Sequence, residues 1–453
     1  MLLSDTLGDN RVPAVGVAAS ALLAVLALAG CPSSVLEPPQ GLDDRDDLEV
    51  LTLDGYVTSG LSNEITFQVP ANTESFLIEV RGDQGRYFLE DLIAPDDREL
   101  VDDGAIVTRG SRELPGMVSW LYPNSPGVTL EPGTYKLRIR SEGIGGSTVL
   151  QEALGLRVYL KERPQFAHCG FKIDFLVADD TVANEDRELL ATALIDSLRG
   201  SYGGHGVSLI DAQVASVSLP TADLDLDADD SDGVGSRAID VIRQVDDVLD
   251  AARAAELIRP GALHIILVRS LGSRLKGYSM GLPGPMDPEF STAAVMVAFS
   301  PFLDSNGNLT QSGIDDMVQT IAHEFGHYLG LYHTSENDQL HHDPIPDTPE
   351  CAGISCPAEY YNNMMTPGGL QRFTVTSGQA EIVRNHPLCI PINSPPPAPT
   401  PTCALNCTGS DLCALVDGQA SCRPACDPNG APCQDAGALC EPDDLGRYHC
   451  TLP

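Results

Sequence analysis

Residues 323–333 read HEFGHYLGLYH, with three histidines, a glutamate and two glycines at defined intervals. His323 and His327 are four residues apart, so on a helix both imidazoles lie on one face and can bind a single Zn²⁺ ion. Gly330 can adopt the left-handed conformation that ends a helix, which would bring His333 round as a third ligand. Three protein ligands leave one position open for water, as in catalytic zinc sites.

Glu324 is the candidate catalytic base of this site. It follows the first histidine and would take a proton from zinc-bound water, whose pKa the metal lowers towards neutrality. The flanking pattern predicts a helix that begins with a capping box formed by Ser312 and Asp315. Apolar residues recur at helical spacing on a face away from the histidines: Ile314, Met317, Val318, Ile321, Phe325 and Leu329. The pattern predicts metal-assisted hydrolysis.

The string fits H-E-x-x-H-x-x-G-x-x-H and so resembles the metzincin clan of zinc metallopeptidases, in which a Met-turn follows the zinc motif. The flanks resemble the pappalysin branch of that clan. A D-T-P string stands at 347–349, and residues 363–365, Asn-Met-Met, are similar to the N-x-M Met-turn of that branch. We assign Met365 as the Met-turn residue, with Met364 as the alternative. The resemblance covers residues 166–391.

The resemblance implies a catalytic domain with a mixed sheet and helices that cleaves extended polypeptides. Strands are predicted at 171–177, 207–210 and 263–268, and helices at 184–199 and 236–258. Residues 293–299 would be the edge strand along which substrate lies, although the same apolar run is also compatible with a buried strand. Asp343 and Asp347 would help to hold a structural ion such as Ca²⁺. Two other acidic loops, 223–232 and 304–315, are typical of solvated loops and do not by themselves predict calcium.

One position departs from the family pattern. Many members of this branch carry a tyrosine two residues after the Met-turn methionine, where it is thought to donate to the oxyanion. Pro367 stands there in this chain, or Thr366 if Met364 is the turn residue. The oxyanion donor is therefore unassigned, and Tyr360 and Tyr361 are the nearby candidates to replace it.

The N-terminus predicts export. Residues 12–30 are apolar and uncharged, and they end in Leu-Ala-Gly before Cys31, which resembles the lipobox of bacterial lipoproteins. Residues 1–30 would be the signal peptide, Cys31 the acylated N-terminus, and 31–47 an acidic, proline-containing tether. A plain signal peptide or a transmembrane helix is the alternative. The predicted location is a bacterial cell envelope, with the outer membrane favoured, or release outside the cell.

Length and charge limit the remaining choices. The 453 residues suffice for more than one domain, and 64 acidic against 27 basic residues give a net charge of −37. Such a charge disfavours nucleic acid and anionic membrane surfaces as partners. A protein or peptide substrate is expected instead, with membrane contact only through the lipid anchor. The sequence makes no prediction of oligomeric state.

The thirteen cysteines fall into three groups. Cys31 belongs to the lipobox, and the other two groups hold even numbers, which predicts disulfides in an oxidising compartment without fixing their pairing. The disulfide candidates are Cys169, Cys351, Cys356, Cys389, Cys403, Cys407, Cys413, Cys422, Cys426, Cys433, Cys440 and Cys450. Cys169 is also a conceivable inhibitory thiolate for the zinc, although pairing is the favoured reading. After the Pro-rich linker 392–402, residues 403–453 predict a small Cys-rich module held by disulfides.

Residues 48–164 predict an all-β sandwich similar to a jelly roll. Short alternating runs at 64–69, 75–80, 86–92 and 134–140 are separated by turn residues, and no long helical period appears. The predicted core residues of this domain are Phe67, Phe76, Ile78, Tyr87, Leu89 and Tyr135. A spacing or folding role for this domain is favoured over carbohydrate binding or substrate docking. The whole chain is therefore expected to be a multidomain α+β protein.

The function expected from these features is that of a surface-tethered zinc endopeptidase. A non-catalytic binding lipoprotein that keeps the zinc helix as a scaffold is the alternative, and the missing tyrosine supports it. An adhesin dominated by the β and Cys-rich modules is a further alternative. Retention of Glu324 argues against a non-catalytic scaffold, since a scaffold needs no base.

Overall fold

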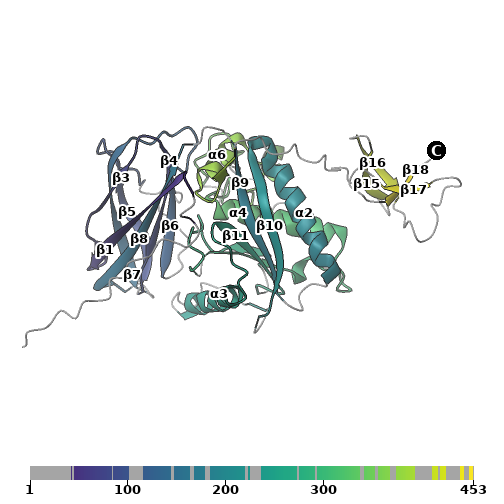
Figure 1. Cartoon of the computed structure of the whole chain (residues 1–453), viewed down its shortest axis with the longest axis horizontal. Helices are drawn as coiled ribbons and strands as arrows, with labels where there is room; N and C mark the ends of the chain where they lie inside the picture. The colour runs from purple at the N-terminus through teal and green to yellow at the C-terminus, as the bar shows by residue number, and fades with distance from the viewer. Residues whose placement is uncertain are drawn as a thin grey trace, which may run out of the picture. The chain divides into compact units, whose positions relative to one another are not determined.

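The computed structural model describes residues 42, 45–83, 85–101, 116–143, 147–163, 168–178, 184–219, 223–224, 236–272, 275–290, 293–336, 341–351, 356–367, 374–392, 411–416, 419–424, 439–442 and 448–451. The predicted signal peptide, Cys31 and most of the predicted tether and linker lie outside these ranges. The fold is mixed α+β, with two large sheets and few helices (Figure 1). Within the described part of the chain, no helix is both long and apolar enough to cross a membrane.

The first sheet is antiparallel and has eight strands. These are β1 (Leu48–Thr58), β2 (Leu61–Ser62), β3 (Ile65–Val69), β4 (Thr73–Arg81), β5 (Gly85–Ile93), β6 (Met117–Tyr122), β7 (Gly133–Gly143) and β8 (Gln151–Glu162). Their order is β3-β7-β2-β1-β8-β4-β6, with β5 paired to β7. The four predicted strands are confirmed as β3, β4, β5 and β7. The sequence did not reveal β1, β2, β6 or β8.

The eight strands form one continuous ladder, whereas the sequence predicts two separate sheets. Its two halves nevertheless enclose one core. Phe67 on β3 and Phe76 on β4 belong to strands that are not neighbours, yet their rings meet edge to face at 5.3 Å. Tyr135 on β7 lies 5.4 Å from Phe76. The predicted core residues of this region are all buried, so the alternating pattern correctly identified its inner face.

The second sheet has six strands and carries the zinc motif on a packed helix. Its strands are β9 (Cys169–Ala178), β10 (Val207–Val217), β11 (Ala262–Val268), β12 (Gly277–Ser279), β13 (Val295–Ala298) and β14 (Ile390–Pro391). Its helices are α2 (Asn184–Tyr202), α3 (Ser236–Ala254), α4 (Gln311–Tyr328), α5 (Ala358–Asn362) and α6 (Ser377–Asn385), with short 3-10 turns η1 (Gly203–His205) and η3 (Ser300–Phe302). The order β10-β9-β11-β13-β12 is parallel except for the antiparallel β12.

The structure corrects the prediction for residues 293–299. Strand β13 in this run is buried at all four positions and lies between β11 and β12, so it is not an edge. At this end of the sheet the edge strand is β12, and β10 lies at the other end. Hydrophobicity favours a fully buried strand here, since both faces of a covered parallel strand are apolar. The helix predicted at 184–199 ends at Tyr202 rather than at Gly200, and the one predicted at 236–258 ends at Ala254.

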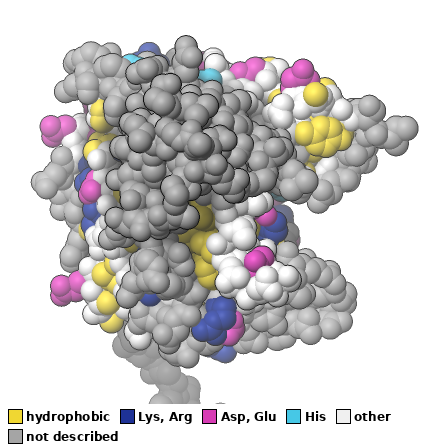
Figure 2. Space-filling view, turned by 90° about the vertical axis from the view of Figure 1, so that its right-hand side faces the viewer, with side chains coloured by type: hydrophobic (Ala, Val, Ile, Leu, Met, Phe, Trp, Pro, Cys, Tyr) yellow, Lys and Arg dark blue, Asp and Glu magenta, His cyan; other side chains and the backbone are white. Residues whose placement is uncertain are grey.

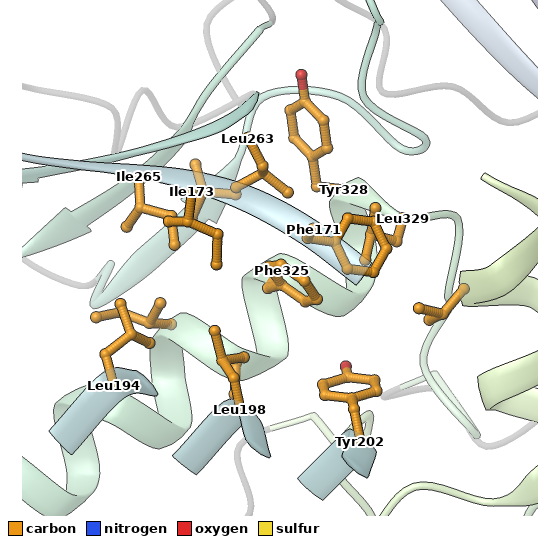
Figure 3. Packing of buried hydrophobic residues seen from close by; sticks show 14 of the residues in the cluster. Phe171, Ile173, Leu194, Leu198, Tyr202, Leu263, Ile265, Phe325, Tyr328 and Leu329 are labelled. Atoms are coloured by element: carbon orange, nitrogen blue, oxygen red, sulfur yellow. The ribbon is translucent and has the colours of Figure 1, made fainter. Parts of the chain in front are cut away.

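Alternate residues of the second sheet face two different cores. Phe171 and Ile173 on β9 point to the side covered by α2 and α4, together with Leu263 and Ile265 on β11 (Figure 3). Leu176 on β9 packs on the opposite side, with α3 residues such as Val245 and Leu249. Helix α4, which carries His323 and His327, is therefore packed firmly against the sheet, since its predicted apolar stripe is buried in the first of these cores.

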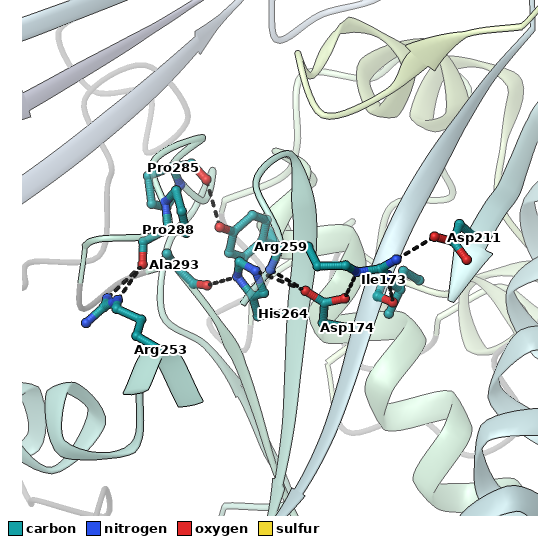
Figure 4. Close-up of polar contacts among 10 residues, drawn as sticks. Ile173, Asp174, Asp211, Arg253, Arg259, His264, Pro285, Pro288 and Ala293 are labelled. Atoms are coloured by element: carbon teal, nitrogen blue, oxygen red, sulfur yellow. Dashed lines mark hydrogen bonds and ion pairs between the residues drawn. The ribbon is translucent and has the colours of Figure 1, made fainter. Parts of the chain in front are cut away.

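A buried ion pair joins three elements of this layer (Figure 4). Asp174 on β9 is fully buried, and one of its oxygens accepts from the backbone N of Arg259 at 2.9 Å while the other pairs with the guanidinium of Arg259. The guanidinium also bonds to Asp211 on β10. His264 Nδ1 donates to Ala293 O over 3.1 Å, and burial lowers the pKa of this histidine. The network fixes the chain segment that leads from α3 to β11.

Strand β8 presents its polar residues to the zinc-motif layer rather than to solvent. Leu156, Val158 and Leu160 enter the core of the first sheet, whereas Arg157 and Lys161 point the other way and are buried. Arg157 pairs with Asp287, and the ammonium of Lys161 donates to Arg384 O and His386 O. The first sheet is thus joined by buried polar contacts to the segment that follows edge strand β12 and to the end of α6.

Glu79 on β4 completes this buried group. Its carboxylate accepts from Tyr159 Oη at 2.9 Å and from the backbone N of Met286. Burial, followed by the nearby Asp287, raises the pKa of Glu79 to about 7. Burial likewise lowers the pKa of Lys161 to about 7. Such shifts are expected where charged groups leave water.

The C-terminal region contains two short hairpins. They consist of β15 (Asp411–Val416) with β16 (Gln419–Pro424), and β17 (Leu439–Pro442) with β18 (Tyr448–Thr451). The backbone register places Cys413 opposite Cys422 and Cys440 opposite Cys450. Cys403, Cys407, Cys426 and Cys433 lie outside the described residues. On the face shown in Figure 2, the coloured acidic and basic side chains are scattered rather than gathered into one patch.

Candidate active site

Helix α4 places the first two histidines and the glutamate. Its N-cap is Thr310, whose side chain accepts from Gly313 N at 3.2 Å, so the predicted capping box at Ser312 and Asp315 is wrong. Thr310 and Ser312 both carry a hydroxyl that can cap a helix, so the sequence pattern does not distinguish the two positions. Phe325 anchors the helix by packing edge to face on Phe171 at 5.3 Å (Figure 3).

Gly330 turns the chain towards the third histidine. Its φ of +97° is a left-handed conformation that side chains rarely adopt. Leu331 N bonds back to Gly326 O at 2.9 Å and closes the helix end. An added Cβ at position 330 would also lie 3.0 Å from Leu121 of β6. Both the backbone and the packing therefore require glycine where the motif has it.

The three histidines converge. One ring nitrogen from each of His323, His327 and His333 lies within 4.8 Å of the others. The Nδ1 atoms of His323 and His327 bond to carbonyl oxygens, those of Met364 and Leu331, both at 2.7 Å. A carbonyl oxygen only accepts, so each of these Nδ1 atoms carries a proton, and in the neutral ring Nε2 then carries the lone pair that can bind a metal.

The spacing of the lone pairs fits a metal ion. His327 Nε2 lies 3.2 Å from His333 Nε2, and the Nδ1 of His333 is 3.0 Å from the Glu336 carboxylate. Both Nδ1 atoms face acceptors, so in the neutral rings the two Nε2 lone pairs point at each other, and a metal ion or a proton between them removes this repulsion. Two nitrogens bound at about 2.0–2.1 Å to a tetrahedral zinc ion would be roughly 3.3 Å apart. The cluster is therefore suited to hold a metal ion.

Glu324 lies beside the edge strand. Glu324 is buried, with 7% of the residue exposed, and its Oε2 accepts from Ser279 N of β12 at 2.7 Å. Gly277 makes room for it, since a Cβ there would come within 2.8 Å of Glu324 Cγ. The sequence placed the glutamate in the site but could not show that edge strand β12 orients its carboxylate.

Both candidate Met-turn residues contact helix α4, in different ways. Met365 is fully buried, and its sulfur would lie 2.6 Å from a Cβ added to Gly326. Met364 supplies the carbonyl that fixes His323. The turn is braced by Asn363, whose Oδ1 accepts from Met365 N at 2.9 Å and whose amide pairs with Gln379 of α6. The Met365 side chain thus lies against the helix at Gly326, as expected of the Met-turn residue.

The two tyrosines near the Met-turn differ in environment. The Tyr360 hydroxyl donates to Ser335 O at 3.4 Å and its ring is buried, whereas Tyr361 is 49% exposed. Thr366 is buried and its hydroxyl donates to Tyr360 O. Neither tyrosine hydroxyl is placed by a contact with the histidines, so the oxyanion donor has no assignment in the described residues.

Asp343 and Asp347 have separate surroundings. Asp347 accepts from Thr376 Oγ1 at 2.7 Å and Gly378 N at 2.9 Å, so its carboxylate caps α6. Asp343 Oδ1 accepts from Thr348 Oγ1 at 2.6 Å, while Oδ2 is buried without a partner. Burial raises the pKa of Asp343 to about 7. An ion held by both carboxylates at once is not indicated by these contacts.

The loop residue Asp304 accepts from the backbone of Asn306 and Asn308, which lowers its pKa.

Two disulfides brace the region. Cys169 pairs with Cys389, where β14 joins β9, so Cys169 is not a free thiolate. Cys351 pairs with Cys356 across a short loop, and Cys351 N donates to Ser335 Oγ at 2.8 Å. Ser335 lies two residues after His333. The second disulfide therefore stabilises the segment that follows the third histidine.

His386 shows how α6 is tied to the loop after β12. It is fully buried, Nε2 lies 3.1 Å from Gly284 O, and Nδ1 accepts from Leu388 N at 3.2 Å. Burial lowers the pKa of His386 to about 3, so the ring is neutral. Three of the ten histidines converge, whereas this one is structural.

No protein-family model and no curated protein sequence matches the chain. Among solved structures, the chain is similar to mature mirolysin of Tannerella forsythia, solved in complex with a cleaved peptide, at 16% identity over 48% of this chain and 91% of that one, with a TM-score of 0.29. A promirolysin mutant of the same bacterium aligns at 16% identity over 48% and 80%, with a TM-score of 0.32. Metalloproteinase-II of Bacteroides fragilis aligns at 12% identity over 46% and 61%, with a TM-score of 0.24. These similarities are partial, so the assignment of function depends on the chain's own residues.

Proposed function

We propose that this chain is an exported, zinc-dependent endopeptidase that hydrolyses extended polypeptides. The observation that carries the proposal is the 3.2 Å approach of the His327 and His333 Nε2 atoms while their Nδ1 atoms face acceptors. His323, His327 and His333 would be the three protein ligands. Catalytic zinc sites have this number of ligands and keep a fourth position open.

When bound, zinc supplies Lewis-acid chemistry, since it acidifies a water molecule and polarises a carbonyl. Glu324 then acts as the general base and takes the proton of the attacking water. The hydrogen bond from Ser279 N orients its carboxylate. The protonated Glu324 next donates to the leaving amine when the peptide bond breaks, which restores the carboxylate.

Edge strand β12 provides the substrate surface. It pairs with β13 on one side, and Ser279 at its end contacts Glu324. An extended peptide that adds to β12 would therefore pass directly beside the catalytic carboxylate. Strand addition uses backbone groups, so this surface would bind many sequences.

Export and anchoring are part of the proposal. The two disulfides in the described residues support folding in an oxidising compartment. Acylation of Cys31 would then hold the chain on the cell envelope. Mass analysis of the N-terminal peptide from the membrane fraction tests this step, and an unmodified Cys31 in that fraction would contradict it.

Removal of the metal should abolish hydrolysis reversibly. We expect chelation to stop cleavage of a denatured protein substrate and stoichiometric zinc to restore it, because the ligand set stays in place on a rigid helix. Gel-based cleavage and circular dichroism, measured on the same samples, check both activity and folding. Full cleavage by folded, metal-free protein would contradict the proposal.

A further inference from the structure

The orientation of His333 depends on contacts from outside helix α4. His323 and His327 lie on α4, and backbone carbonyls of the protein orient their rings. His333 follows the turn at Gly330, and its Nδ1 lies 3.0 Å from Glu336 Oε2. Two of the three groups that bond to these Nδ1 atoms are backbone carbonyls, and the third is the Glu336 side chain. A side chain, unlike a carbonyl, can be replaced without altering the backbone.

The backbone of Glu336 is fixed although its side chain is 32% exposed. Its N–H donates to His341 O at 2.8 Å, and the preceding Ser335 bridges to His342 in an antiparallel pair. Thr334 N donates to Met365 O at 3.2 Å, which ties the same segment to the Met-turn. The carboxylate is therefore presented to His333 from a braced segment rather than from a free loop.

We propose that Glu336 is a positioning residue that raises the metal affinity of the site. Its carboxylate holds the proton of His333 on Nδ1, so the lone pair on Nε2 faces the other two ligands. Its negative charge also makes the His333 imidazole more basic than a carbonyl partner would, so Nε2 donates its lone pair to the metal more strongly. The inference rests on the proposed zinc site, and it adds a residue that the motif does not contain.

Zinc affinity of the full chain tests this role. Competition with a chelator of known affinity should show Glu336→Gln binding zinc about 10-fold more weakly than wild type and Glu336→Ala up to about 100-fold more weakly. Gln keeps an oxygen that accepts from Nδ1 but loses the charge, and Ala loses both. Glu359→Gln, which removes an exposed carboxylate from α5, is the matched control and should bind as wild type does.

Two measurements separate positioning from a merely structural role. The thermal midpoint of the metal-free variants should equal that of wild type, since the Glu336 side chain is partly exposed. Nitrogen NMR of histidine-labelled, metal-free protein should show the His333 proton on Nδ1 in wild type and a mixture of tautomers in Glu336→Ala.

Three results would overturn the inference. The first is zinc affinity within about two-fold of wild type in both variants while wild type binds one zinc, which would leave the proposed function intact. The second is a loss of zinc affinity that is accompanied by a lower thermal midpoint of the metal-free variants. The third is a folded wild type that binds no zinc, which would overturn the proposed function as well.

Discussion

Glu324→Gln is expected to lower kcat by about 10²–10⁴-fold on a denatured protein substrate while zinc remains bound at the wild-type ratio. Gln has the size of Glu and can still accept from Ser279 N, so the packing against Gly277 is preserved. It cannot take a proton from water. Initial rates and the zinc content of the same preparations measure the two effects separately.

Asp315→Asn is the matched control for this substitution. It removes an exposed carboxylate near the start of the same helix, where Asp315 accepts from Gln311 Nε2 at 2.9 Å. Its turnover should equal that of wild type. Equal turnover by Glu324→Gln would remove Glu324 from the mechanism. No cleavage by folded, zinc-loaded wild type would instead favour the non-catalytic binding protein.

Arg157→Met is expected to destabilise the protein by about 3–5 kcal/mol, because it leaves the buried carboxylates of Glu79 and Asp287 without their cation. The loss should be greater at pH 8 than at pH 5. The folded-state pKa of Glu79 is already raised to about 7, so stability falls as pH rises from the unfolded value through 7, and removal of Arg157 steepens this fall. Urea unfolding at both pH values measures it.

The chain offers a reporter and a control for this experiment. Trp120 on β6 is the sole tryptophan, and it is buried in the same sheet, so its fluorescence follows unfolding of this region. Arg138→Met removes an arginine of β7 that is 46% exposed and pairs with Asp91 at 2.7 Å. Surface pairs contribute about 0–1 kcal/mol. Equal losses for Arg138→Met and Arg157→Met would contradict the buried network.

The candidate site could be read from the sequence because its parts are local. His323, Glu324 and His327 fall within one helical turn and a half, and Gly330 sets the turn to His333. Periodicity of 3.6 and a residue that tolerates positive φ are both properties of short segments. Alternation likewise identified four of the strands and the core of the first sheet.

Features that depend on contacts between distant segments could not be predicted. The edge strand was assigned to 293–299 because strand order is not written in any one strand, and β12 at Gly277–Ser279 is too short to show alternation. Glu336 looks like an ordinary loop acid until its backbone is placed beside His333. Arg157 and Lys161 lie on a strand that the sequence did not reveal, and their burial depends on a second layer that covers them.

X-ray absorption at the zinc edge tests the central claim most directly. The account predicts about one zinc per chain in purified, oxidised protein, with three imidazole nitrogens at about 2.0–2.1 Å and one lighter oxygen ligand. A single imidazole around the metal, sulfur ligands, or no zinc in folded protein would contradict it.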